Sequence, residues 1–511
     1  MTPLIIFPFL IPLITGFSAL LKRRGRRRVA FSIGVTANLI AAVVIMASTY
    51  DGTILISQMG DHPMPFGISL VIDSLSAIML LLTAVIAFLV GIFAMATIDA
   101  NRERFAFFPL FAFLVAGLNF AFLTGDLFSL YVAFEIMLMS SFVMLTLGGE
   151  RGQLEGGIKY VTINLISSTI FVVAAGLTYA VAGTLNMAHL AIRFSQLADP
   201  GVTLVLAGMF LIAFGIKAAI FPLFFWLPAS YHTPPIAVTA LFGGLLTKVG
   251  IYAMWRVLIL ILPAATAILQ PLLITVSIFT MIVGVLGAVA QMDVRRLLSF
   301  HVISQIGYLL MSLAIGTTDA LSAGIFFMAH VILAKTALFL ISGIVHELEG
   351  SYHLKHLGSV AKRHPGAAVM FFIAALALAG IPPFSGFWAK FLLLRAGIEA
   401  QQYLLVGVGL AVSLLTLYSM IKIWNEVFWK PNTYTPSADE QPTPLTRIER
   451  RAMIGAAAVM VVLVFALGIA PESMISLSNR AAAELFPNGL GHSGYVDAVV
   501  AASAEIGGLS E

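Results

Sequence analysis

Long apolar segments recur from one end of this chain to the other. Each holds about 17 or more residues, enough for a helix to cross a hydrocarbon core of about 30 Å. Of the 511 residues, 60% are hydrophobic and 10% are charged, whereas soluble domains carry about 25% charged residues. The sequence therefore predicts an all-α membrane protein with about fourteen transmembrane helices, because segments of this length span lipid as helices.

The first apolar segment has no basic residues before it and is followed by a basic run at 22–28. We therefore expect a retained span rather than a cleaved secretory signal. The expected spans cover residues 4–21, 29–49, 69–96, 105–123, 126–147, 158–182, 203–226, 236–258, 267–290, 298–316, 320–346, 366–395, 403–424 and 452–475.

Basic residues set the expected orientation. Placing the run at 22–28 in the cytoplasm puts most loop Lys and Arg residues on that side, as the positive-inside rule requires. The prediction is a multi-pass protein of the bacterial inner membrane with both termini outside. The net charge of +4 then reflects topology, and no nucleic acid partner is expected. Five basic residues are expected within helices: Lys217, Lys248, Lys335, Lys390 and Lys422.

Two stretches, 105–258 and 267–424, resemble two copies of one five-helix unit. Asp126-Leu-Phe-Ser-Leu is similar to Asp293-Val-Arg-Arg-Leu-Leu-Ser, and Pro222-Leu-Phe-Phe-Trp226 is similar to Pro383-Phe-Ser-Gly-Phe-Trp388. Because five crossings are an odd number, the second copy must be inverted relative to the first, an arrangement typical of secondary transporters. The expected parts are three N-terminal helices at 1–104, the first repeat at 105–258, the second repeat at 259–428, and a cytoplasmic linker with the last helix and tail at 429–511.

Buried charges are the candidates for function. A Lys or Glu at the centre of a helix costs about 2.5 to 3.5 kcal/mol on insertion scales, so it persists only with a partner or a use. Glu135 is the one carboxylate expected near the middle of a span, since Asp73 and Asp126 lie at helix ends. The predicted proton pathway consists of Glu135, Lys217, Lys248, His330, Lys335 and Lys390.

Two of these lysines lie beside predicted helix breaks. Lys217 comes one turn before Pro222, which cannot donate to the carbonyl of Ala218, so a free acceptor is expected beside the ammonium. Lys390 follows Pro382 and Pro383 instead. This opposite placement in the two copies is what an inverted pair needs if its lysines are to face different half-channels.

The other candidates are placed by their neighbours. Lys248 lies between small residues that allow close helix approach. His330 and Lys335 are five residues apart, about 140° around a helix, so they are expected to contact different neighbours. His301 is either a packing residue or part of the relay, and Lys422 is expected to be an interfacial anchor.

The remaining motifs indicate structure rather than chemistry. His232-Thr-Pro-Pro235 is expected to form a rigid turn, His353 and His356 a solvated basic loop, and residues 430–450 a polar linker. The absence of cysteine excludes thiolate-bound iron–sulfur clusters in this chain, and we expect neither a cofactor nor a metal site.

With these residues in view, the chain resembles the antiporter-like family that includes the proton-pumping membrane subunits of complex I and the large subunits of Mrp-type antiporters. The motifs that carry the resemblance are Gly125-Asp-Leu-Phe-Ser-Leu-Tyr-Val-Ala-Phe-Glu135, Gln153-Leu-Glu-Gly-Gly-Ile-Lys159-Tyr, His232-Thr-Pro-Pro, Leu246-Thr-Lys-Val-Gly250, Arg295-Arg-Leu-Leu-Ser-Phe-His301 and Gly380-Ile-Pro-Pro-Phe-Ser-Gly386. By this resemblance Glu135 and Lys217 match the family's ion pair, Lys248 its connecting lysine and Lys390 its exit lysine. Val331 stands where relatives often have a second histidine beside the one matching His330.

The resemblance implies a transporter subunit, not an enzyme, that exchanges protons for a monovalent cation such as Na+. Its expected partners are antiporter subunits of the A, B, C, E, F and G types, membrane lipid, protons and, indirectly, Na+. A subunit of a complex I-like NADH dehydrogenase or membrane-bound hydrogenase is the main alternative. A non-conducting scaffold is the second, and the buried charges argue against it. Neighbouring genes discriminate most cheaply, because flavin and iron–sulfur proteins accompany a redox-driven pump.

Overall fold

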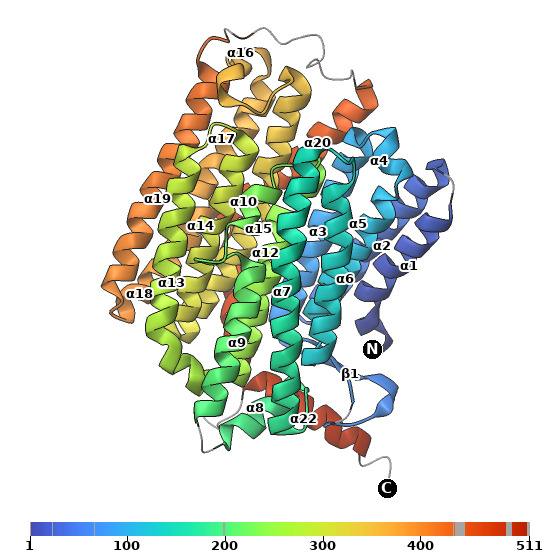
Figure 1. Ribbon diagram of the computed structural model, residues 1–511, viewed down its shortest axis with the longest axis vertical. Coiled ribbons are helices and arrows are strands. Elements are labelled where there is room, and N and C mark those ends of the chain that lie inside the picture. The colour runs from blue at the N-terminus through green and yellow to red at the C-terminus, as the bar shows by residue number, and fades with distance from the viewer. Residues whose placement is uncertain are drawn as a thin grey trace.

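The computed structural model describes residues 2–22, 24–65, 67–197, 200–432, 434, 445–486 and 493–507. Long, roughly parallel helices form a bundle, and short elements lie at its two ends (Figure 1). Within the described residues, 12 helices are long and apolar enough to cross a membrane, and α5 and α17 are shorter apolar helices. The predicted all-α membrane architecture is confirmed, while the count of fourteen spans stays a prediction.

The N-terminal part contains helices and one small hairpin. Its elements are η1 (Thr2–Ile6), α1 (Phe7–Leu21), α2 (Arg24–Ser48), β1 (Leu55–Gln58), η2 (Met59–Asp61), β2 (Ser69–Ile72), α3 (Ser74–Thr97) and α4 (Ala100–Arg104). The predicted span at 69–96 was wrong at its start, because residues 69–72 pair antiparallel with β1. Asp73 then caps α3 by accepting from the Ser76 N–H, so the helix begins after it.

The first predicted repeat contains one interrupted helix and two π-helical segments. Its elements are α5 (Phe107–Leu123), α6 (Leu127–Thr146), α7 (Arg151–Ala182), α8 (Met187–Ser195), α9 (Pro200–Ala218), α10 (Trp226–Ser230), α11 (Ile236–Leu241), η3 (Phe242–Leu246), α12 (Thr247–Met254) and η4 (Trp255–Ile261). The predicted span at 203–226 is broken between α9 and α10, where Ala219 takes a φ of 61°. The turn expected at His232 lies between α10 and α11.

The second predicted repeat is interrupted at the corresponding place. Its elements are α13 (Pro263–Ala290), α14 (Val294–Ile315), α15 (Thr318–Glu349), η5 (Leu354–His356), α16 (Val360–Arg363), α17 (Pro365–Ala379), α18 (Ser385–Glu399), α19 (Tyr403–Ile423) and η6 (Trp424–Trp429). The break between α17 and α18 divides the predicted span at 366–395. Helix α15 is the centre of the bundle: it is buried along its membrane-length window and packs against α14, α17, α18, α20 and α21.

The starts of α6 and α14 are built alike, which supports the similarity between the two predicted repeats. Asp126 caps α6 and forms a β-bridge with Asn186, while Asp293 caps α14 and forms a β-bridge with His353. Helix α8 follows the first bridge at the lower end of Figure 1, and α16 follows the second near the upper end. The same capped helix start with its β-bridge thus occurs at opposite ends of the bundle, as two inverted copies require. The exact domain boundaries stay predictions.

The C-terminal part differs from the expectation. Its elements are α20 (Arg447–Ile469), α21 (Glu472–Leu485) and α22 (Gly494–Gly507). The predicted span at 452–475 was wrong at its end, because α20 stops at Ile469 and α21 begins as a separate helix after Pro471. Most of the predicted linker, residues 433 and 435–444, lies outside the described residues. Helix α22 returns to the lower end, where it packs against α8 (Figure 1).

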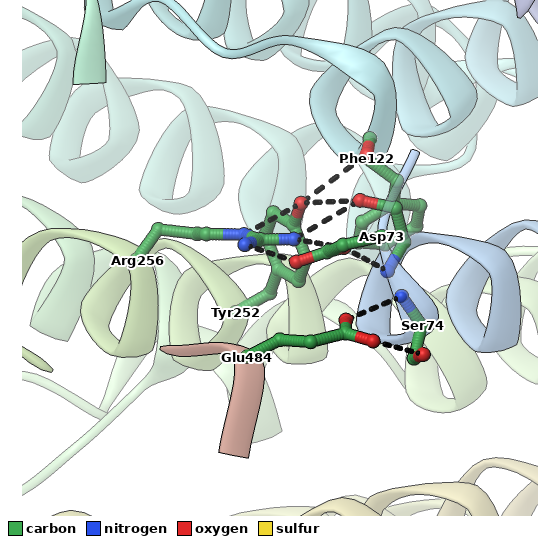
Figure 2. A network of polar contacts seen from close by, with 7 residues as sticks. Asp73, Ser74, Phe122, Tyr252, Arg256 and Glu484 are labelled. Carbon is green, nitrogen blue, oxygen red and sulfur yellow. Dashed lines mark hydrogen bonds and ion pairs between the residues drawn. The ribbon is translucent and has the colours of Figure 1, made fainter. Parts of the chain in front are cut away.

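A buried ion pair joins the N-terminal part to the first repeat. The Arg256 guanidinium, in η4, donates to both carboxylate oxygens of Asp73 at 2.6 and 2.5 Å (Figure 2). Both residues are buried, and the Tyr252 hydroxyl accepts from Arg256 Nε at 3.1 Å. The sequence did not single out Arg256 as a sixth basic residue inside a helix. Burial acts most strongly and raises the pKa of Asp73, but the Arg256 charge together with the hydrogen bonds from Arg256 and Ser76 holds this pKa below its ordinary value.

Glu484 connects α21 to this pair. Its carboxylate accepts from the Ser74 N–H at 2.8 Å and from the Ser74 hydroxyl at 2.6 Å, at the N-terminus of α3 (Figure 2). Burial, together with the nearby Asp73 charge, raises the pKa of Glu484 to about 7. The C-terminal segment is therefore attached to the bundle through a carboxyl group that titrates near neutral pH.

This attachment predicts a pH-dependent stability. A carboxyl whose pKa is higher in the folded than in the unfolded protein binds more protons when folded, so stability falls as pH rises from about 4.5 towards 7. The melting temperature of the detergent-solubilised protein is expected to drop by about 2 to 4 °C more between pH 5 and pH 8 in the wild type than in Glu484→Gln. Glu472→Gln, at an exposed position of the same helix, is the control and should follow the wild type. Parallel curves for wild type and Glu484→Gln would contradict the expectation.

Candidate functional site

The six predicted residues lie on five helical segments. Glu135 is on α6, Lys217 near the end of α9, Lys248 on α12, His330 and Lys335 on α15, and Lys390 on α18. Lys248, His330 and Lys335 are fully buried, and Lys390 is 4% exposed. Glu135 and Lys217 are half-buried. All six therefore occupy helices of the bundle, and none lies in a connecting loop.

Glu135 and Lys217 do not form a direct ion pair in this conformation. Among the described residues, no carboxylate lies within 4.0 Å of the Lys217 ammonium, and Glu135 Oε1 is a buried oxygen without a hydrogen-bond partner. The ammonium instead donates to the Ser168 hydroxyl at 3.4 Å and lies 5.8 Å from the centre of the Phe134 ring. Phe134 precedes Glu135 on α6, so the two charges are on neighbouring elements without touching.

The end of α9 differs from the expected geometry. Ile220 N–H donates to the Gly215 carbonyl at 3.0 Å, and the Trp226 indole N–H donates to the Ile216 carbonyl at 3.0 Å. These contacts satisfy backbone oxygens next to the break. The acceptor predicted beside Lys217 was the Ala218 carbonyl, whereas the acceptor observed there is the Ser168 hydroxyl.

Lys248 is held by a widened turn of its own helix. Its ammonium donates to the Gly243 carbonyl at 2.5 Å, within the π-helical segment η3. Such segments displace a carbonyl from the usual backbone pattern and are frequent at functional sites. The predicted close helix approach is also present, because a Cβ on Gly244 would lie 2.4 Å from the Thr336 hydroxyl oxygen of α15.

His330 and Lys335 contact different neighbours, as their spacing predicts. His330 Nδ1 is 2.8 Å from the Ser385 hydroxyl at the start of α18, whereas the Lys335 ammonium lies 3.5 Å from the Leu298 carbonyl of α14. His301 is also buried, and its Nε2 is 2.5 Å from the Ser419 hydroxyl of α19. His301 is therefore hydrogen-bonded, and it lies on α14, the helix whose Leu298 carbonyl is near Lys335.

Lys390 fills the break between α17 and α18. Its ammonium donates to the carbonyls of Leu378 and Ala379 at 3.1 and 2.8 Å, and to the Ser413 hydroxyl at 2.9 Å. These carbonyls end α17, where no following helical N–H is available to them. The break thus supplies the acceptors that a buried ammonium needs.

Lys422 lies near the end of α19 and contacts the end of a neighbouring helix. It donates to the carbonyls of Val289 and Gln291 at 2.9 and 2.8 Å, where α13 ends. A cation in this position complements the partial negative charge of a helix C-terminus. These hydrogen bonds connect α19 to the end of α13.

The sequence did not predict several polar side chains that lie near the six candidate residues. Ser168 and Ser413 contact lysines, and Gln305 is fully buried with neither amide atom bonded to a described residue. A serine or glutamine in an apolar helix gives little signal, because its helical face becomes known only from the packing. Among the described residues, no group of three or more His, Asp or Glu side chains is placed to hold a metal ion.

Comparisons with known proteins agree with this architecture. Residues 124–416 match the family model described as NADH:quinone oxidoreductase/Mrp antiporter, transmembrane. The chain is 44% identical over 85% of its length to a protein from Alkalihalophilus pseudofirmus named as the D-type subunit of an Na(+)/H(+) antiporter, of which 89% is covered. It is 35% identical over 98% of its length to a Bacillus subtilis protein of the same name, which is covered completely.

The chain is also similar to a solved structure. A chain in the Mrp complex from Dietzia sp. superposes with a TM-score of 0.89 at 32% identity, over 98% of this chain and 100% of the other. The matches extend over the helix breaks and the buried lysines. This chain therefore belongs to the NADH:quinone oxidoreductase/Mrp antiporter family of transmembrane subunits.

Proposed function

We propose that this chain is the D-type, proton-translocating subunit of a multisubunit Na+/H+ antiporter in a bacterial inner membrane. Protons move along Glu135, Lys217, Lys248, Lys335 with His330, and Lys390. Na+ is coupled through the partner subunits, and the chain is a transporter subunit rather than an enzyme.

The observation that carries this proposal is the environment of the buried lysines. Lys248, Lys335 and Lys390 contact backbone carbonyls and a hydroxyl, and no carboxylate lies within 4.0 Å of them among the described residues. An ion pair fixes charge in place, whereas neutral acceptors satisfy the ammonium and still let it lose its proton. Such a row suits proton transfer better than permanent structural bonding.

A proton-pumping subunit of a complex I-like NADH dehydrogenase or membrane-bound hydrogenase is the alternative in the same family. The names of the relatives at 44% and 35% identity favour the antiporter. A gene neighbourhood with flavin and iron–sulfur proteins would favour the alternative.

Glu135 and Lys217 are expected to act as one unit in transport. A Lys217 ammonium that approaches Glu135 favours the carboxylate, and one that withdraws lets it take a proton. Glu135→Gln and Lys217→Met should each reduce ΔpH-driven Na+ uptake by about 100-fold, and the double variant should be no slower than either single one. The measurement is transport by the complete assembly in vesicles. Rates that multiply in the double variant would show that the two residues act independently.

Lys390→Ala is expected to abolish antiport while leaving insertion and assembly intact, since removal of a buried charge eases membrane insertion. The transport rate should fall by about 100-fold or more. Lys422→Ala is the matched control, because this lysine also donates to two helix-terminal carbonyls but lies outside the proposed row. Lys422→Ala should retain transport and lower the melting temperature. Wild-type transport by a fully assembled Lys390→Ala variant would refute the proposed pathway.

A further inference from the structure

A cavity lies beside Lys217. It has a volume of about 30 Å³, and among its lining residues are Tyr160, Asn164, Lys217, Tyr231 and Gly250. A water molecule needs about 10 to 15 Å³ of such space and two to four polar partners. The cavity is therefore large enough for water, and its wall combines an ammonium, an amide and phenol groups.

Tyr231 provides an unused polar group in this wall. Its side chain is fully buried, and its hydroxyl has no hydrogen-bond partner among the described residues. Tyr160 differs, because its hydroxyl is 2.6 Å from the Ser141 hydroxyl. Buried hydroxyl groups are almost always satisfied by protein or ordered water. Since Tyr231 borders the cavity, water there would give its hydroxyl a partner.

A polar stripe on α7 continues from the cavity in both directions. Gln153, Tyr160, Asn164 and Ser168 are separated by seven, four and four residues, which places them on one face of the helix. All four are buried. At one end Ser168 accepts from Lys217 at 3.4 Å, and at the other Gln153 donates to the Thr233 carbonyl at 3.4 Å. The stripe therefore runs from the turn after α10 to the Lys217 ammonium.

The turn after α10 lies near the charged start of α14, which we call the basic end of the bundle. His232, next to Tyr231, is close enough to Asp293, Arg295 and Arg296 at the start of α14 for their charges to act on it. The cap of α14 bridges to His353, near η5 and α16 at the upper end of Figure 1. Tyr231 therefore lies between these charged residues and the cavity.

We propose that Tyr231 is a positioning residue for proton uptake: its hydroxyl orders water in the cavity, and the α7 stripe connects that water to the basic end of the bundle. A proton from the basic end passes along water to the neutral amine of Lys217, and each water that gives a proton receives one from the next. No other reactant is needed. The inference rests on the proposed function and adds the route by which Lys217 is reached.

Tyr231→Phe tests the hydroxyl while keeping the ring. In the complete assembly, the maximal rate of ΔpH-driven Na+ uptake is expected to fall about tenfold, with the half-saturating Na+ concentration unchanged. The ratio of rates in H2O and D2O should rise, because proton delivery becomes the slow step. Tyr495→Phe is the control, a fully buried tyrosine near Arg256 and remote from the cavity, and should transport at the wild-type rate with an unchanged ratio.

The wild-type chain has no cysteine, which allows a second test of the water path. Asn164→Cys places a thiol at the cavity, and Leu165→Cys places one on the outer face of α7, where the side chain is 49% exposed. The folded protein is first treated with Ag+, a small thiol-binding ion, and is then denatured and alkylated. If water reaches the cavity, Ag+ should bind the first thiol, that of Asn164→Cys, and block its alkylation, which the mass of the chain reports. In lipid vesicles the second should stay unprotected.

The outcomes separate this inference from the proposed function. If Lys390→Ala is inactive but Tyr231→Phe transports at the wild-type rate, the uptake route is wrong and the proposed function stands. If Tyr231→Phe is slow with an unchanged isotope ratio and a lower melting temperature, Tyr231 is only structural and the inference fails. If Lys390→Ala transports normally, the proposed function itself fails.

Discussion

The burial of ammonium groups in a lipid-spanning bundle is the constraint on which this structure depends. A charge at this depth costs several kcal/mol unless polar atoms surround it. Regular helices have no spare acceptors, because each carbonyl is bonded within its own helix. At two of the lysines the chain frees acceptors by breaking or widening a helix: Lys390 reaches two carbonyls at the end of α17, and Lys248 reaches Gly243 in a π-helical turn. At Lys390 and Lys248 the interruption of the helix therefore serves the buried charge.

A buried arginine is accommodated in a different way. Arg256 is as deeply buried as the lysines, yet it is paired with Asp73 through two hydrogen bonds. A guanidinium stays charged at any physiological pH and matches a carboxylate in geometry, so this pair is suited to fixing α3 against η4. Glu484 adds α21 to the same place through Ser74. The bundle thus holds the permanent charge of Arg256 in an ion pair and leaves Lys248, Lys335 and Lys390 with neutral acceptors.

Sequence alone predicted the features that depend on local pattern. Apolar length indicated most of the helices, proline indicated both helix breaks, and the charge penalty indicated the buried lysines. The sequence did not predict features that depend on partners distant in the chain. The strand at 69–72 is apolar enough to extend a helix but pairs with β1. Arg256 looks like a residue at a helix end until its contact with Asp73 is known. The contact of Lys217 with Ser168 could not be predicted either, because it depends on how α7 and α9 pack.

The two broken helices hold their lysines in different ways, and the difference bears on the direction of proton movement. An ammonium has three donors, and Lys390 finds three acceptors: two carbonyls and the Ser413 hydroxyl. Carbonyls only accept, so after Lys390 loses a proton only Ser413 can rotate its hydrogen, now bonded to the Ala379 carbonyl, towards the amine. Lys217 has one long hydrogen bond and lines a cavity of about 30 Å³, which is large enough for water beside the ammonium. Lys390 is thus surrounded by fixed protein acceptors, while Lys217 borders space that water can fill. In the proposed pathway, this difference suits proton uptake at the break near Lys217 and release at the break near Lys390.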